Sequence, residues 1–260
     1  MKLYHYTSID TLFAMLEKSI IEDDDTNVKY VEFWARHTSC LKDKSEYKFF
    51  IDKLIEKIKE HAKSLNHIFS NDELKILSRI NQSYLYTISL TDNGYSHYMW
   101  KEYGGNHDGV CLEIDFDAVP PFYRCKDGRF VMENAYNSML TRCEYVQAKD
   151  LEVEEDLVKN ICQYIINKGN VDVVKGAAMI ARLENTAIAY KTMNFAQESE
   201  FRFVLGSVEP VDYIKHPIPI SAITSITLGS SIKDEEKINL ITQKITETLG
   251  DFVSVKTQDL

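Results

Sequence analysis

Two glutamates and an arginine alternate with other residues in the segment FAQESEFRFVL, residues 195–205. The alternation predicts a strand, because successive side chains of a strand point to opposite faces. Glu198, Glu200 and Arg202 then share one face, while the apolar side chains after them point into a core. Such a charged face is either a solvated ladder of ion pairs or the lining of a cleft in which a glutamate meets a developing positive charge. The segment alone leaves both interpretations open.

A histidine near the beginning of the chain is a second candidate. His5 lies in LYHYTS, residues 3–8, where we predict a short strand followed by a helix. Alternation places His5 and Thr7 on one face of that strand and Tyr4 on the other. A lone histidine on a short strand is more often structural than functional, so a role for His5 requires support from other segments.

Aromatic side chains are concentrated after the predicted strand that contains Ser89. Tyr98, Trp100 and Tyr103 follow it within a few residues, beside the break formed by Gly104 and the next glycine. Tyrosine and tryptophan rings of this kind either pack in a core or offer a planar surface on which another aromatic ring stacks. Both interpretations remain open.

Arg36 lies in FWARHTSCLKDKSEY, residues 33–47, on a predicted extended stretch before a helix. A guanidinium group there either binds phosphate or lies on the surface. The familiar phosphate and metal motifs GxGxxG, GxxxxGK[ST], HExxH and CxxC do not occur, and no histidines or cysteines have metal-ligand spacing. We therefore expect no metal site.

The composition describes a folded protein, with 44% hydrophobic residues but only 10 Gly and 5 Pro in 260 residues. A net charge of −10 argues against sequence-independent coating of nucleic acid, although a local basic patch remains compatible with it. The five cysteines are widely spaced, and the longest apolar runs are shorter than the roughly 18 residues of a membrane helix. We expect a cytoplasmic protein with reduced thiols and no membrane partner.

Hydrophobic periodicity predicts an α+β fold, because the strands are too scattered for a regular βαβ repeat. The predicted strands cover residues 2–6, 28–38, 84–90, 109–116, 139–146, 195–205, 223–228 and 252–256. The predicted helices cover residues 8–18, 44–65, 70–82, 154–168, 171–189 and 234–249. No linker or repeat interrupts the chain, so residues 1–260 are predicted to form a single domain with helical insertions at about 44–82 and 154–189.

Several segments, taken in order, resemble a bacterial family known as domain of unknown function 2971. They are LYHYTS, ARHTSCLKDKSEY, TISL, WKEYGGNHDGVCLEID and ESEFR, and the pattern WxxYGxxHxGVCLE is the most specific part. That family in turn resembles a distant branch of the ADP-ribosyltransferases, which carry a first-strand histidine, a middle strand with Ser or Thr, and a late strand with ExE or QxE. His5, Ser89 and the pair Glu198 and Glu200 occupy that order. The resemblance implies a split β-sheet core.

The resemblance further implies that the chain transfers ADP-ribose from NAD⁺, as co-substrate, to an intracellular protein or nucleic acid. Glu200 would be the catalytic carboxylate, Glu198 would orient or deprotonate the acceptor, and His5 would orient the ribose. The residues expected around NAD⁺ are His5, Tyr6, Thr7, Arg36, Ser89, Tyr98, Trp100 and Tyr103.

A toxin or phage-defence role, with a neutralising antitoxin as partner, is also implied by the resemblance. Nicotinamide leaves as a neutral molecule, so the reaction needs no metal. Two alternatives remain: an NAD⁺ glycohydrolase that uses water in the same cleft, and a non-catalytic binding module that kept the fold.

Overall fold

The computed structural model describes residues 1–18, 20–23, 28–41, 46–74, 85–119, 123–124, 130–131, 135–167, 172–207 and 211–258. Contacts within the chain group its residues into two compact units. Unit 1 comprises Met1–His37, Leu85–Arg142 and Gln197–Leu260, and unit 2 comprises Thr38–Tyr84 and Cys143–Ala196. The described parts of the two expected helical insertions fall in unit 2, and the single-domain organisation stays a prediction.

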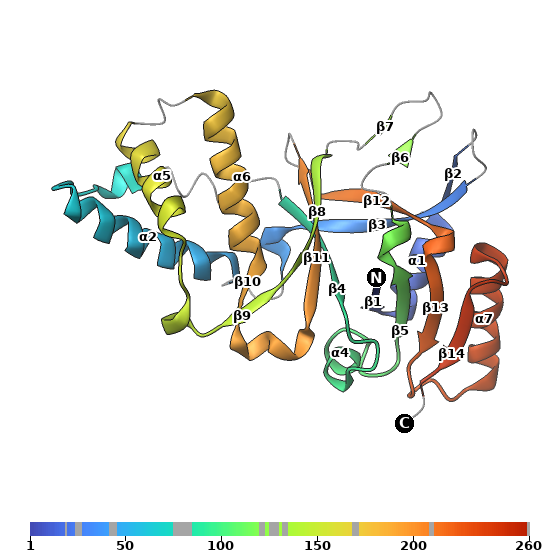
Figure 1. Cartoon of the computed structure of the whole chain (residues 1–260). Helices are drawn as coiled ribbons and strands as arrows, with labels where there is room; N and C mark the ends of the chain where they lie inside the picture. Colours follow the sequence, from blue (N-terminus) through green and yellow to red (C-terminus); the bar gives the residue numbers. More distant parts are fainter. Residues whose placement is uncertain are drawn as a thin grey trace. The chain divides into compact units, whose positions relative to one another are not determined.

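Unit 1 is built on a mixed sheet, ten-stranded in its described part, which is consistent with an α+β fold. Its strands are β1 (Lys2–Thr7), β2 (Ile20–Asp23), β3 (Val28–His37), β4 (Leu85–Thr91), β5 (Val110–Asp115), β8 (Ala135–Arg142), β11 (Glu200–Ser207), β12 (Tyr213–Pro219), β13 (Ile223–Leu228) and β14 (Ser254–Thr257). The order along the main path is β12-β3-β4-β1-β5-β13-β14, and β11 joins β4 to β8 (Figure 1). The strands β13 and β14 are parallel and are connected by helix α7 (Glu235–Leu249).

The sheet divides at β4, whose two edges are paired differently. Along one edge β11 pairs from Leu85 to Thr91 without interruption. Along the other edge β3 pairs with Tyr86 and Thr87, and β1 pairs with Thr91. Between these two contacts, around Ser89, none of the described strands pairs with this edge of β4. The strands β1 and β3 therefore separate on either side of the middle of β4.

The first strand leads directly into helix α1 (Ile9–Lys18), as the sequence predicts. Ser8 begins the helix, because its Oγ accepts a hydrogen bond of 3.1 Å from the backbone N–H of Thr11. Leu12, Met15 and Leu16 of α1 are buried, in agreement with the hydrophobic periodicity.

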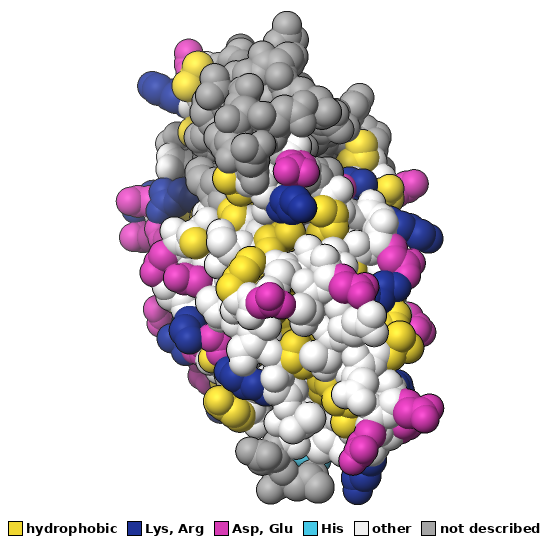
Figure 2. Space-filling model, turned by 90° about the vertical axis from the view of Figure 1, so that its right-hand side faces the viewer, with side chains coloured by type: hydrophobic (Ala, Val, Ile, Leu, Met, Phe, Trp, Pro, Cys, Tyr) yellow, Lys and Arg dark blue, Asp and Glu magenta, His cyan; other side chains and the backbone are white. Residues whose placement is uncertain are grey.

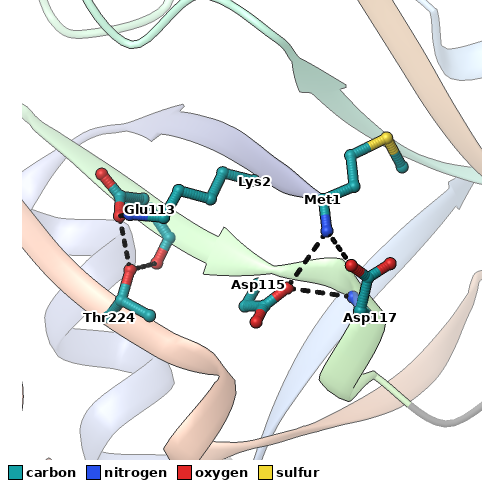
Figure 3. Close-up of polar contacts among 6 residues, drawn as sticks. All are labelled: Met1, Lys2, Glu113, Asp115, Asp117 and Thr224. Carbon is teal, nitrogen blue, oxygen red and sulfur yellow. Dashed lines mark hydrogen bonds and ion pairs between the residues drawn. The ribbon is translucent and has the colours of Figure 1, made fainter.

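Polar contacts join the beginning of β1 to β5 and β13 (Figure 3). The amino group of Met1 pairs with Asp115 and Asp117. Lys2 Nζ lies 2.6 Å from Glu113 Oε1, which also accepts a hydrogen bond of 2.7 Å from the hydroxyl of Thr224. Exposed ion pairs contribute little stability. The position of β1 is therefore fixed mainly by its pairing with β5 over six residues.

In its described residues, unit 2 consists mainly of the helices α2 (Glu46–Ser64), α5 (Glu155–Ile166) and α6 (Val173–Ala189) and a short parallel pair, β9 (Glu144–Val146) and β10 (Tyr190–Thr192). Phe50, Leu54 and Ile58 of α2 lie in its core, as their spacing predicts. The predicted capping box is also present, because Ser70 Oγ accepts from Glu73 N–H and the Glu73 carboxylate accepts from Ser70 N–H. The remainder of that predicted helix, residues 75–82, lies outside the described residues.

Two predicted strands need correction. The strand expected over 195–205 begins only at Glu200, and the 3₁₀-helix η4 (Met193–Glu198) precedes it. The strand expected over 139–146 is two strands, β8 and β9, separated at Cys143. The strand β12 was not predicted, because Pro217 lies inside it. Proline is tolerated there because β12 ends the described path of the sheet, so an edge of the strand needs no backbone donor.

The surface seen from the side on which α7 lies in Figure 1 carries interspersed acidic and basic side chains (Figure 2). The net charge of −10 is therefore not gathered into one acidic patch on this face. Among the helices of the described residues, none combines the length and the apolar character that crossing a bilayer would require. The remaining described elements are α4 (His97–Glu102), the 3₁₀-helices η1 (Thr38–Cys40), η2 (Phe116–Ala118), η3 (Ala148–Asp150) and η5 (Ile220–Ala222), and the pair β6 (Tyr123–Arg124) and β7 (Phe130–Val131).

The cap between β1 and α1 can be tested by substitution. Ser8→Ala removes the acceptor of the Thr11 N–H, so we expect the free energy of unfolding to fall by about 1 kcal/mol. Ser8→Asp supplies another capping oxygen and should retain most of that stability. Urea unfolding measures both variants, and an equal loss in the two would show that the cap is not the stabilising contact.

Candidate functional site

A cavity of about 100 Å³ lies in unit 1 where the sheet divides. Residues from β1, β4, α4 and the beginning of β11, which are far apart in the sequence, come together around it. The lining residues are Tyr4, His5, Tyr6, Ser89, Leu90, Met99, Tyr103, Glu198 and Glu200. The cavity thus brings together the histidine, the serine strand and the two glutamates that the sequence singled out.

The side chain of His5 bridges the divided edge of β4. His5 Nδ1 lies 3.0 Å from the carbonyl oxygen of Ser89. A carbonyl oxygen only accepts, so Nδ1 carries the proton and donates it. Burial lowers the pKa of His5 below its usual 6.5, although the bond to Ser89 opposes this, so the ring is neutral at neutral pH. Its Nε2 is then a hydrogen-bond acceptor at the cavity.

Glu200 forms a buried ion pair with Arg202. Glu200 Oε2 lies 2.9 Å from Arg202 Nη2, and the two side chains are 6% and 1% exposed. Both residues belong to β11 and share a face, as predicted. The solvated ladder, however, is wrong for this segment, because Glu198, Glu200 and Arg202 are all buried. A carboxylate held by a buried guanidinium is a charge of fixed position at the edge of the cavity.

Glu198 reaches the same cavity from a different element. It ends η4, and Ser199 then adopts φ +45°, in the left-handed region, so the chain turns a corner before β11. The two glutamates therefore line one cavity without sharing a strand face. The hydroxyl of Tyr103 donates a hydrogen bond of 2.6 Å to Glu198 Oε1. This bond fixes the orientation of the second carboxylate.

Tyr103 is positioned by a tightly packed loop between α4 and β5. Its backbone N–H donates to the carbonyl of Met99 at 2.9 Å. Trp100 is fully buried, and its ring packs perpendicular to that of Tyr6 with 5.1 Å between centroids. A Cβ on Gly109 would lie 2.4 Å from the carbonyl oxygen of Thr7, so only glycine fits there. The most specific sequence pattern, which includes Trp100 and Gly109, thus builds the support for Tyr103.

Four of the expected NAD⁺ contacts, Thr7, Arg36, Tyr98 and Trp100, do not line the cavity. Trp100 is a core residue, and Tyr98 packs half-buried against the same cluster. Thr7 is buried, and Arg36 is exposed on β3. Tyr6 lines the cavity, donates its hydroxyl to the Asn93 carbonyl at 2.9 Å, and has a pKa raised above 10 chiefly by burial.

Tyr4, Leu90 and Met99 also line the cavity, and the sequence did not predict them there. Tyr4 precedes His5 on β1. A Cβ added to Gly94 would lie 2.5 Å from Cε1 of the Tyr4 ring, so this ring packs directly against the glycine. No local pattern in the sequence predicts this contact, because Gly94 and Tyr4 lie far apart in the chain. Within the part of the chain that the structure describes, no three His, Cys, Asp or Glu side chains come together as metal ligands.

Residues 99–203 match the family model described as Protein of unknown function (DUF2971). The match includes Tyr103, Glu198, Glu200 and Arg202, and His5 lies outside it. Comparison with curated proteins gives no match to the chain, and neither does comparison with solved structures. The matched segment supports the resemblance to this family that the sequence motifs indicate.

The lowered pKa of His5 makes stability depend on pH. The unfolded chain binds a proton at His5 near pH 6.5, and the folded protein binds it only at lower pH. The free energy of unfolding should therefore fall as pH drops below 6.5, by up to about 1.4 kcal/mol per pH unit. His5→Gln lacks this proton and should show a shallower fall in urea unfolding between about pH 7 and pH 5. Parallel curves for the two proteins would contradict the buried neutral ring.

The bond from Tyr103 to Glu198 should be visible in stability as well. Tyr103→Phe removes only the hydroxyl that a buried carboxylate accepts from, and we expect a loss of about 1.5–3 kcal/mol. Tyr95→Phe is the matched control, because Tyr95 is exposed and its loss should stay within about 0.5 kcal/mol. Thermal or urea unfolding compares the two variants, and equal stabilities would show that the bond is not formed in solution.

Proposed function

We propose that the chain is an NAD⁺-dependent ADP-ribosyltransferase that modifies a macromolecule, protein or nucleic acid. The observation that carries the proposal is the convergence of His5 on β1, Ser89 on β4 and the pair Glu198 and Glu200 on one cavity. This is the order of a first-strand histidine, a middle strand and a late ExE segment. The division of the sheet at β4 also supports a split-sheet core of the kind that the resemblance implies.

The size of the cavity indicates which end of NAD⁺ it would hold. Cavities that enclose a whole drug-sized ligand measure about 300–1000 Å³. At about 100 Å³ this cavity has room for no more than a single ring, so only the nicotinamide end would enter and the rest of NAD⁺ would lie outside. The rings of Tyr4 and Tyr103 beside the cavity offer planar partners for nicotinamide.

The two carboxylates suit the bond changes of the reaction. The bond between C1′ of the ribose and the nicotinamide nitrogen breaks, and its electron pair leaves with neutral nicotinamide. The ribose becomes oxocarbenium-like, as in glycoside hydrolysis. A pre-positioned opposite charge such as Glu200 is worth about 3–4 kcal/mol in such a transition state. The acceptor oxygen or nitrogen then bonds to C1′ and its proton passes to Glu198.

His5 would orient the ribose rather than transfer a proton. Its Nδ1 proton is committed to the Ser89 carbonyl, and its neutral Nε2 accepts hydrogen bonds. A ribose hydroxyl is a donor of the required kind, and holding the sugar in one orientation lowers the entropic part of the barrier. Arg202 acts through Glu200, whose carboxylate it holds in place.

Incubation of the pure protein with NAD⁺ labelled in its adenylate part distinguishes the candidate functions. Transfer predicts label bound covalently to a cellular protein or nucleic-acid fraction, with nicotinamide released in equal amount. Nicotinamide release without any bound label would identify an NAD⁺ glycohydrolase. Absence of NAD⁺ binding in calorimetry would identify a non-catalytic module and contradict the proposal.

Replacing Glu200 tests the catalytic role. Glu200→Gln keeps the side-chain volume and removes the charge, so transfer should fall about a hundredfold to a thousandfold. The change also leaves the guanidinium of Arg202 buried without its carboxylate, which can destabilise the fold. The double variant Glu200→Gln with Arg202→Met removes both charges and separates the two effects. A double variant that melts like the wild type and still transfers ADP-ribose would remove Glu200 from the mechanism.

A further inference from the structure

Two exposed aromatic rings stack on β12, which ends the described path of the sheet in unit 1, and on its neighbour β3. Trp34 and Tyr213 are each 44% exposed, their centroids lie 5.2 Å apart, and their planes differ by 17°. The register pairs Tyr213 with Arg36 and Lys215 with Trp34, so these four side chains share one face of the two strands. The strands lie side by side in Figure 1. We refer to Trp34, Arg36 and Tyr213 as the aromatic platform.

The charge of this face is positive at Arg36. The acidic residue on the same face, Glu32, is nearly buried and accepts a hydrogen bond of 2.7 Å from Lys215 Nζ. These two charges therefore balance each other. The guanidinium of Arg36 is exposed beside Tyr213, where it matches a phosphate group in charge and geometry.

The aromatic platform and the cavity lie on the same face of the sheet. Arg36 is in register with Thr87 of β4, and Glu200 is in register with Thr91. Thr87 and Thr91 are four residues apart on one strand, so their side chains point to the same face, about 13 Å from each other. Thr87 and Thr91 are buried, whereas Ser89 between them on the same face is exposed, so a ligand that extends from the aromatic platform to the cavity would pass Ser89.

We infer that the aromatic platform binds single-stranded nucleic acid, and that single-stranded nucleic acid is the acceptor class presented to the cavity. The second part rests on the proposed function. Exposed aromatic rings bind unpaired bases by stacking with little sequence preference, and a neighbouring arginine binds the phosphate between them. A duplex hides the faces of its bases, and a peptide does not alternate planar groups with phosphates. Because the chain is acidic overall, the interaction depends on stacking more than on bulk charge.

The fluorescence of Trp34 reports ligand binding at this surface. The chain has two tryptophans, and Trp100 is fully buried while Trp34 is exposed. Titration with single-stranded RNA or DNA of about ten nucleotides, without NAD⁺, should quench the emission of Trp34. The duplex of the same sequence should quench it much less. Trp34→Phe should lose the quenching while it retains binding in fluorescence anisotropy of a labelled oligonucleotide.

Three substitutions separate stacking from charge. Trp34→Ala and Tyr213→Ala should each weaken oligonucleotide binding at least about fivefold, since each removes a stacking surface. Arg36→Gln should reduce the slope of log K against log salt by about 0.7, the value for one phosphate of a single strand. Phe252→Ala, an exposed aromatic residue outside the aromatic platform, is the matched control and should leave binding unchanged.

Two results would overturn the inference. Quenching of Trp34 by NAD⁺ but not by oligonucleotides would assign the aromatic platform to the adenine end of the co-substrate. Binding of an unphosphorylated peptide at this surface, without oligonucleotide binding, would assign it to a protein acceptor. The titration uses neither NAD⁺ turnover nor Glu200, so its failure leaves the proposed transfer chemistry standing. Conversely, if the protein binds oligonucleotides but releases no nicotinamide from NAD⁺, the role of the aromatic platform is supported and the proposed transfer function is contradicted.

Discussion

The hydrogen bond from His5 to the Ser89 carbonyl is the contact on which the candidate site depends. The strands β1 and β3 leave β4 at different points, so none of the described strands supplies a backbone donor to the Ser89 carbonyl on this edge. His5 supplies the donor at 3.0 Å, and the ring of Phe33 on β3 packs against it with 5.4 Å between centroids. One side chain thus closes the opening in the sheet and, through its other nitrogen, presents an acceptor to the cavity. The division of the sheet and the chemistry of His5 are parts of the same arrangement.

Each of the two carboxylates of the site is held by a neighbouring side chain that fixes its position. Arg202 holds Glu200 from within β11, and Tyr103 holds Glu198 from the loop after α4. The buried ring of Trp100 and the close approach of Gly109 to β1 in turn fix that loop. Charges oriented before a ligand arrives need no rearrangement during reaction, which is the condition under which they stabilise a developing positive charge most effectively.

Sequence periodicity predicted the regular elements well and the site only in outline. The helices α1, α5 and α7 begin and end within two residues of expectation, because caps such as Ser8 and the apolar spacing are local signals. The corner at Ser199 was not predicted, since a left-handed turn at a serine depends on packing rather than on propensity. Burial of Arg202 likewise depends on neighbouring strands far away in sequence. The segments that carry chemistry could be identified in advance, whereas the element and the partner of each side chain required the tertiary structure.

We propose that the cavity beside His5 receives the nicotinamide end of NAD⁺, and nitrogen NMR of histidine-labelled protein can test this proposal. We expect a neutral His5 ring with its proton on Nδ1, and a change in the Nε2 resonance as NAD⁺ is added. His61, on helix α2 of unit 2, should not respond. NAD⁺ that binds at saturation without altering the His5 resonances, or a His5 ring protonated on Nε2, would contradict the account.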